Sequence, residues 1–360
     1  MIDKKIGIGL IGSQFISTIH AEALKMVSDA SIVAVMSPTK SNVKKFAAQF
    51  NIPNWYTNLD DFLANETIDL VVIGAPNYLH CEITLKVAKA KKHLVVEKPL
   101  CLNLHEADQM IAACKENKVK LMYAEELCFT PKYVRLKSLL DEGALGTPVF
   151  FKQSEKHDGP HADHFWDVER SGGGVTMDMG CHAIQFFRWL NPNARVTSVY
   201  AQMQTSVHAD KTKGDDNSII ILEFDNNVTA LAEESWTKKG GMDDRAEIHG
   251  STGVAYADVL QGNSILTYSE KGVGYAVEKA GNTQGWSFTM YEEIWNYGFP
   301  QEFAHFVDCV KNNKEPLVTG EDGKAVLEII HAAYASAGSG QKINLPYRSE
   351  ALKPIALWKK

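Results

Sequence analysis

The sequence lacks the features that direct a protein to nucleic acid, membranes or export. Its densest basic cluster is Lys89, Lys91 and Lys92, and the formal net charge is −7. A mildly acidic chain gains little affinity from counterion release, so we expect no nucleic-acid partner and no membrane partner. No apolar run approaches the ~20 residues that span a bilayer, and no secretory leader stands at the start. We therefore expect a cytoplasmic protein.

Cysteine is also sparse, and its spacing excludes two small-domain architectures. The chain of 360 residues has six cysteines with no C-x-x-C pair. Irregular spacing argues against a zinc ribbon and a disulfide framework. Scattered thiols in a chain of this length are typical of a reducing compartment. The cysteines are Cys81, Cys101, Cys114, Cys128, Cys181 and Cys309.

Residues 1–125 alternate short apolar runs with amphipathic stretches. The run at 70–75 is continuously apolar, as in a strand that is buried on both faces. Alternation of strand and helix predicts a parallel sheet with right-handed crossovers, hence an α/β fold. We place strands at 6–11, 32–36, 70–75, 93–97 and 120–124, and helices after residue 12 and at 43–50, 79–90 and 104–117.

After residue 124 the pattern changes to helices followed by consecutive strands. Strands without intervening helices predict a large open, mostly antiparallel sheet in a second, α+β domain. We therefore divide the chain into domains 1–125 and 126–346 and a tail at 347–360. The expected helices are 131–142, one continuous helix from the glycine triplet at 172–174 to Trp189, 300–310 and 321–337; the expected strands are 147–156, 195–204, 218–224, 228–236, 245–249 and 265–269.

The phosphate-binding loop of the first domain is not where the glycine string first suggests. Gly7, Gly9 and Gly12 spell G-x-G-x-x-G, but the first two lie inside the strand, whereas a phosphate loop follows the strand and opens the helix. The correctly placed loop, 12–17, keeps only its first glycine. A helix N-terminus there still offers N–H groups to a phosphate. The candidate contacts are Gly12, Ser13, Gln14, Phe15 and Ile16.

The segment after the second strand leaves the choice between NAD and NADP open. An acidic residue at this place binds the ribose hydroxyls of NAD, and none is present. Ser37, Thr39 and Lys40 could instead accept a 2′-phosphate, or form a polar loop.

Three further motifs carry a family resemblance. Ala75-Pro76-Asn77-Tyr78-Leu79-His80 follows one strand, Glu97-Lys98-Pro99 follows the next, and Gly172-Gly173-Gly174 precedes Asp178 and His182. In this order the set resembles the glucose–fructose oxidoreductase, inositol dehydrogenase and rhizopine-catabolism (Gfo/Idh/MocA) family, over about residues 6–346. The resemblance implies a Rossmann domain, a second domain with an open sheet, and oxidation of a secondary alcohol on a sugar or inositol. It also implies that Lys98 and His182 face the substrate beside the nicotinamide.

The chemistry of these residues supports the same roles. Alcohol oxidation needs a base of near-neutral pKa, and histidine is the usual choice, so we predict His182 as the base. Asp178 lies four residues earlier, on the same face of the expected helix, and could orient the imidazole or bind the substrate. Lys98 ends a parallel strand, where ligands of α/β sheets bind, and its ammonium would stabilise a developing alkoxide.

The residues around Lys98 are expected to contact the cofactor. Glu97 could pair with a cofactor hydroxyl or with Lys98 itself. Ala75, Pro76, Asn77 and His80 are predicted on the nicotinamide side. The Lys98–Pro99 bond could be cis, because an X–Pro bond costs only ~0.5–1 kcal/mol in that form.

A polar and aromatic stretch at 155–166 supplies candidate substrate contacts. Flat apolar faces and several donors suit a sugar ring, so we select His157, Trp166 and Arg170, together with Glu125 at the end of the strand at 120–124. Three histidines in eight positions also raise a metal site, but the spacing fits no standard zinc pattern, and we assign no metal.

These observations predict an NAD- or NADP-dependent dehydrogenase of a sugar, inositol or a derivative. A redox-neutral glycosidase or lyase, which oxidises its substrate transiently and eliminates a group, is the alternative. A ligand sensor without activity would be expected to lack the catalytic residues. Exposed strand faces associate, so we expect a homodimer or homotetramer through the region of about 195–270.

Overall fold

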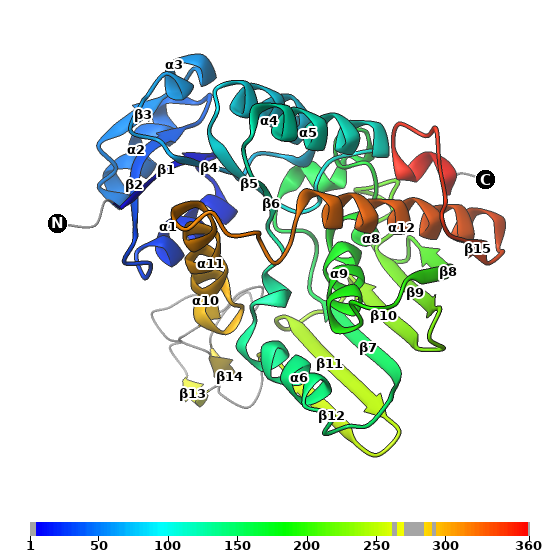
Figure 1. The fold of residues 1–360 in the computed structure, drawn as a ribbon. Coiled ribbons are helices and arrows are strands. Elements are labelled where there is room, and N and C mark those ends of the chain that lie inside the picture. Colours follow the sequence, from blue (N-terminus) through cyan, green and yellow to red (C-terminus); the bar gives the residue numbers. More distant parts are fainter. Residues whose placement is uncertain (1–4, 261–264, 270–283, 290–292, 359–360) are drawn as a thin grey trace. The chain divides into compact units, whose positions relative to one another are not determined.

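The computed structural model describes residues 5–260, 265–269, 284–289 and 293–358 (Figure 1). The chain forms two compact units. Unit 1 comprises 1–126 and 298–327, and unit 2 comprises 127–297 and 328–360. The chain leaves unit 1 after residue 126, one residue beyond the expected boundary. Residues 298–327 were expected in the second domain but belong to unit 1. None of the helices in the described ranges is long and apolar enough to cross a membrane.

Unit 1 is built on a six-stranded parallel sheet of order β3-β2-β1-β4-β5-β6. The order reverses at β1, so right-handed crossovers place the helices on both faces. Helices α1 and α11 pack against each other, as do α4 and α5 (Figure 1). The strands are β1 (Ile6–Ile11), β2 (Ala30–Met36), β3 (Asn54–Tyr56), β4 (Leu70–Ile73), β5 (His93–Val96) and β6 (Leu121–Tyr123); the helices are α1 (Phe15–Leu24), α2 (Lys40–Phe50), α3 (Leu59–Leu63), α4 (His80–Lys89), α5 (Leu104–Asn117) and α11 (Phe299–Lys311).

Local sequence signals fix several of these boundaries. Asn103 caps α5 by accepting a hydrogen bond from the Glu106 N–H, and the Glu106 carboxylate accepts from the Leu102 N–H. This reciprocal arrangement satisfies donors that a helix start otherwise leaves open. All four residues of β4 are buried, which confirms the strand predicted from its continuous apolar run.

Unit 2 contains a seven-stranded sheet of order β12-β11-β7-β10-β9-β8-β15. The β7–β10 pair is parallel and the other neighbouring strands are antiparallel, which confirms the mostly antiparallel sheet that the sequence predicted. The sheet strands are β7 (Pro148–Lys156), β8 (Val196–Gln204), β9 (Asn217–Phe224), β10 (Thr229–Ser235), β11 (Asp243–Gly250), β12 (Val254–Asp258) and β15 (Ile343–Asn344); β13 (Ile265–Ser269) and β14 (Gly285–Thr289) form a separate pair; the helices are α6 (Pro131–Asp141), α7 (Val168–Ser171), α8 (Val175–Asp178), α9 (Gly180–Leu190), α10 (Glu293–Asn296) and α12 (Gly320–Ser339), which begins in unit 1.

The structure has two helices where the sequence predicted one. The predicted continuous helix from the glycine triplet to Trp189 is divided at Met179 into α8 and α9. Helix α9 packs on β10 and β7, and α8 packs on β9 and β10. The opposite face of the sheet exposes apolar side chains, among them Tyr200, Ile219 and Tyr256.

Candidate functional site

The loop between β1 and α1 requires the glycine that the sequence retains there. Gly12 has φ +120°, and a Cβ at this position would lie 2.5 Å from Ser17 Oγ and 2.7 Å from the Gly74 carbonyl oxygen. Both contacts are too short for any side chain. The backbone of Gly12 therefore stays bare at the point where the loop turns into α1.

The other two glycines of the string have a packing role inside the strand. A Cβ on Gly7 would lie 1.9 Å from the Thr67 carbonyl oxygen, and one on Gly9 would lie 2.6 Å from the Phe62 ring. These contacts explain both glycines without a ligand, and both lie within β1, as the sequence analysis inferred.

Ser17 stands where a third glycine would ease the packing of the helix on the strand. It is buried, and a Cβ on Gly74 would lie 3.1 Å from its hydroxyl. The missing side chain at Gly74, just after β4, thus makes room for Ser17. Helix α1 starts with Gln14 as its extended N-cap and has no acidic residue in its first turn. Its free N–H groups suit a phosphate.

The predicted ribose-side residues lie beside the phosphate loop. The Ser13 hydroxyl donates to the Ser37 hydroxyl over 2.9 Å, which connects the loop after β1 with the loop after β2. Thr39 is the N-cap of α2, and Lys40 is its exposed first residue. The structure therefore brings these two groups of cofactor candidates together in unit 1.

His80 connects two loops at the carboxyl edge of the sheet. Its Nε2 lies 2.8 Å from the Ala75 carbonyl oxygen, and its Nδ1 lies 3.0 Å from that of Pro99. Burial lowers the pKa of His80, although the carbonyl contacts and the charge of Glu97 act in the opposite direction. Because both ring nitrogens contact backbone oxygens, the side chain holds the loop after β4 against the turn after β5. Its contact with the cofactor remains a prediction, as does that of buried Asn77.

Glu97 forms a contact that the sequence did not suggest. His20 Nε2 lies 2.7 Å from Glu97 Oε1, and the other carboxylate oxygen accepts the Lys98 N–H over 3.0 Å. Burial tends to raise the pKa of Glu97, but the hydrogen bond and charge of His20 and the charge of Lys98 hold it below its usual value. The carboxylate thus fixes the backbone of Lys98. The Lys98–Pro99 bond is cis.

A second buried carboxyl group lies near Glu97 in unit 1. Glu302, on α11, has no exposed surface, and burial together with the negative charges of Glu126, Glu97 and Glu125 raises its pKa well above the usual value. Glu125 itself, a predicted substrate contact, is fully buried just after β6.

The glycine triplet of unit 2 is anchored by residues that are distant in sequence. Asp215 accepts the N–H groups of Gly174 (3.1 Å) and Thr176 (2.8 Å), and the Tyr334 hydroxyl donates to Asp215 over 2.5 Å. A Cβ on Gly174 would lie 2.0 Å from the Asp215 carbonyl oxygen. Close approach of two backbones therefore requires glycine here and fixes the start of α8.

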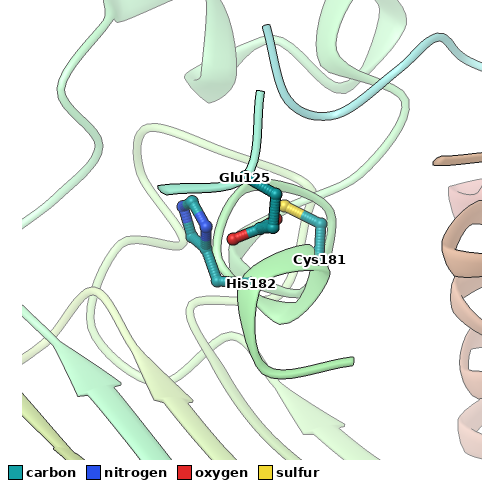
Figure 2. Close-up of side chains that lie close together, drawn as sticks. All are labelled: Glu125, Cys181 and His182. Atoms are coloured by element: carbon teal, nitrogen blue, oxygen red, sulfur yellow. The ribbon is translucent and has the colours of Figure 1, made fainter. Parts of the chain in front are cut away.

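Asp178 and His182 lie on either side of the break at Met179. Asp178 ends α8 and accepts the Trp236 Nε1–H over 3.2 Å, while His182 is the third residue of α9. Both side chains are almost fully buried. The single-helix argument for their shared face is thus wrong, and Trp236 orients the carboxylate. Figure 2 shows Cys181 and His182 at the start of α9, and also labels Glu125 of unit 1.

The candidates from the polar stretch differ in their surroundings. His157 is buried, with Nδ1 2.7 Å from the Gly159 carbonyl oxygen. Trp166 packs edge to face on Trp236, with ring centroids 5.4 Å apart, which brings it close to the partner of Asp178. The Arg170 side chain is 59% exposed and forms an ion pair with Asp167, and its contact with a substrate remains a prediction.

Four residues of these surroundings were missed by sequence reasoning: His20, Asp215, Trp236 and Tyr334. Each acts through a contact across at least 41 residues of sequence. None belongs to a local motif that would have identified it.

Comparisons with known proteins identify the family to which the chain belongs. The model of an oxidoreductase family with an NAD-binding Rossmann fold matches residues 6–125, and that of the family's C-terminal alpha/beta domain matches 137–345. The chain is 28% identical to myo-inositol 2-dehydrogenase of Thermotoga maritima over 340 residues, 94% of this chain and 98% of that one. It is 27% identical to the NAD(+) scyllo-inositol 2-dehydrogenase of Bacillus subtilis, over 94% of this chain and 95% of that one.

A solved structure is similar over almost the whole length. The crystal structure of GenD2 from gentamicin A biosynthesis, in complex with NAD, has a TM-score of 0.90 and 29% identity, and the match covers 96% of this chain and 98% of that one.

Proposed function

Since this chain belongs to the Gfo/Idh/MocA oxidoreductase family and carries an NAD-binding Rossmann domain, we propose that it oxidises a secondary alcohol of a sugar, an inositol or a derivative, with His182 as base and Lys98 stabilising the alkoxide. The relatives named above are inositol dehydrogenases that cover the same length, which supports this substrate class. The observation that carries the proposal is the support built around Lys98 and Asp178. Glu97 fixes the backbone of Lys98, and Trp236 holds the carboxylate of Asp178.

The residues after β1 fit a dinucleotide. Gly12 leaves bare backbone where any Cβ would clash, and the N-terminus of α1 presents N–H groups without an acidic side chain beside them. Gly12, Ser13 and Gln14 would hold the pyrophosphate, with Ser37 and Thr39 toward the ribose. Bound NAD supplies the acceptor for the hydride.

The protein's own groups handle the proton. The C–H bond of the alcohol breaks with its electron pair, and the hydroxyl proton passes to the imidazole of His182, which yields a ketone and a reduced nicotinamide. The ammonium of Lys98 lowers the energy of the developing alkoxide. Asp178 orients the imidazole or binds a neighbouring hydroxyl, and His157 and Trp166 contact the ring.

A panel of inositols and sugars with NAD or NADP, followed by NADH or NADPH absorbance, tests the proposal. We expect turnover of at least one polyol, and a loss of about 10²–10⁴-fold in kcat for His182→Ala, the range for a general base. Lys118→Ala, at the exposed end of α5, is the control. The proposal fails if no polyol is oxidised, or if His182→Ala is as active as the parent. Cleavage of a glycoside with no net reduction of cofactor would instead establish the redox-neutral alternative.

We also propose that copies of the chain associate through the exposed face of the unit 2 sheet. Tyr200, Ile219, Val254 and Tyr256 are each more than 40% exposed on that face. Apolar side chains exposed on a sheet face favour association. Light scattering should give the mass of a dimer or tetramer, and Ile219→Lys with Tyr256→Lys should lower it. A monomeric parent would contradict this.

A further inference from the structure

A row of buried polar side chains crosses four strands on the helix-covered face of the unit 2 sheet. In the strand register Ser218 of β9 lies opposite Glu234 of β10, Glu234 beside Glu155 of β7, and Glu155 opposite Asp244 of β11. Residues paired in this way point to the same face of a sheet. None of the four side chains is more than 6% exposed. Figure 1 shows the four strands side by side.

Several oxygens of this row have no hydrogen-bond partner among the described residues. They are Oδ2 of Asp244 and the hydroxyl of Ser218, and no side chain of the described residues donates to either carboxylate oxygen of Glu234. Buried polar atoms in folded proteins are nearly always paired, so each such atom indicates a missing partner. Because carboxylate oxygens accept hydrogen bonds, the missing partner is a donor.

Gln153 gives independent support, since it belongs to no acidic cluster. It is fully buried on β7, two residues before Glu155, and its Nε2 donates to Asp244 Oδ1 over 3.1 Å. Its amide oxygen therefore lies at the row, and within the described structure it too has no partner. A neutral acceptor with the same unmet requirement again points to a ligand that brings several N–H or O–H donors.

The charge of the row favours a cationic donor. Burial raises the pKa of Asp244 to about 7, and burial with the charge of Asp244 raises the pKa of Glu234 well above its usual value. The neighbouring basic side chains, Lys152 and Lys156, pair with Glu233 on the other face. A positive charge bound at the row would replace protons on these carboxyl groups and relieve their mutual repulsion.

The spacing distinguishes an ammonium group from a metal ion. Neighbouring strands lie about 4.8 Å apart, so Glu234 and Asp244, two strands apart, are separated by roughly 10 Å. In the described part of the chain these carboxylates do not converge on one point as the ligands of a metal ion do. A row of this length suits a ring that carries an amino group and hydroxyls.

The row is also adjacent to the reacting groups of unit 2. Glu234 and Trp236 are two residues apart, about 7 Å along a strand. Trp236 donates to Asp178, so a substrate ring held at the row can extend to Asp178 and His182.

We propose that Glu234 and its neighbour Glu155 bind a protonated amino group, with Asp244 and Gln153 left to accept from hydroxyls of the same ring, so that the substrate of this enzyme is an amino sugar or an aminocyclitol. The inference rests on the proposed oxidation and names its substrate class. Charge-assisted hydrogen bonds to a buried carboxylate are roughly twice as strong as neutral ones, which gives the row selectivity for an amine over a hydroxyl.

The test compares matched compounds that differ in one group. Scyllo-inositol, its monoamine and the N-acetylated monoamine form one set; glucose, glucosamine and N-acetylglucosamine form another. We expect kcat/KM with the free amine to exceed that of both neutral analogues by about tenfold or more, because each factor of ten is ~1.4 kcal/mol. The preference should weaken above the pKa of the amine. Binding of each compound is measured separately by calorimetry in the presence of NAD.

Two neighbouring substitutions provide a matched control. Glu234→Gln should reduce the ratio of amine to neutral kcat/KM, and the ratio of affinities, by about tenfold. Glu233→Gln, one residue earlier and on the opposite face, should leave both ratios unchanged. Thermal unfolding of both variants shows whether they fold.

The outcomes separate this inference from the proposed function. Oxidation of neutral polyols without preference for the amine overturns the inference and leaves the function standing. Tight, Glu234-dependent binding of amines without oxidation of any compound supports the inference and refutes the function. Magnesium chloride alone could also raise the thermal unfolding temperature as much as the amines do. If EDTA abolishes this increase, the row is a metal site and the inference is overturned.

Discussion

Breaking the buried pair of His20 and Glu97 should destabilise unit 1 more than the loss of any surface ion pair. The two side chains are 1% and 8% exposed, and Nε2 and Oε1 are 2.7 Å apart. Removing one partner of a buried pair leaves the other without compensation and costs about 3–5 kcal/mol. We therefore expect His20→Ala to lower the free energy of unfolding by about that amount. Part of the loss comes from the contact of the His20 ring with Phe303, whose ring centroid is 5.0 Å away.

A double-mutant cycle removes the packing contribution. His20→Ala, Glu97→Gln and the double variant are unfolded in urea, and the transition that includes unit 1 is followed by circular dichroism. The loss of the Phe303 contact is common to both His20 variants and cancels, so the coupling energy reports the pair alone. We expect a coupling of about 1–3 kcal/mol, the range for residues in direct contact. Additive losses, or a loss below about 1 kcal/mol for His20→Ala, would refute the reasoning.

The pH dependence has a definite sign. The pKa of Glu97 in the folded protein lies below its usual value of 4.5. A carboxyl group with a lowered folded pKa adds stability above its unfolded pKa, and this stability is lost as the pH falls through the folded value. The difference between the parent and His20→Ala should therefore be largest near neutral pH and shrink in acid below 4.5. A difference that grew in acid would show that the pair is not ionic.

Two further substitutions test the supports of the site. Trp236→Phe keeps a buried ring but removes the donor to Asp178. We expect it to lower the free energy of unfolding by about 1–3 kcal/mol and to lower kcat by more than it changes the Kd of NAD. An unchanged kcat would show that this hydrogen bond does not position Asp178. Gly12→Ala places a Cβ 2.5 Å from Ser17 Oγ, so NAD titration should show at least about tenfold weaker binding. Gly143 also has positive φ, but a Cβ there meets nothing within 4 Å. Gly143→Ala should therefore lower the free energy of unfolding by only about 1 kcal/mol and leave NAD binding intact. Equal effects of the two glycine variants would contradict the clash argument.

The sequence predicted elements where one residue pattern determines the structure. Strand β1 has the predicted bounds, because an apolar run that ends in glycine permits few other conformations. The helix division at Met179 was not predictable, since Gly174 to Trp189 reads as one amphipathic segment. The start of α8 was equally hidden, because it is fixed by Asp215 across 41 residues.

The motifs predicted the identity of the site residues better than they predicted the contacts of these residues. Glu97 was expected to pair with a cofactor hydroxyl or with Lys98, and it does contact the Lys98 N–H, but its other oxygen binds His20, 77 residues earlier. A motif indicates that a carboxylate is required at a position, but it does not identify the side chain that the carboxylate contacts. The partner is determined by the packing of α1 on the sheet.

The buried acidic row shows how strand order creates a site that no single segment contains. Alternation along β10 places Glu234 on the face of Ala230 and Ala232, and alternation along β11 places Asp244 on the face of Ala246 and Ile248. Each strand alone therefore shows only an acid at the polar end of an apolar face. The parallel pairing of β10 with β7, and the antiparallel pairing of β7 with β11, bring these acids into register. Shifting either pairing by one residue would turn an acid to the other face, so the row depends on the same register that buries the core.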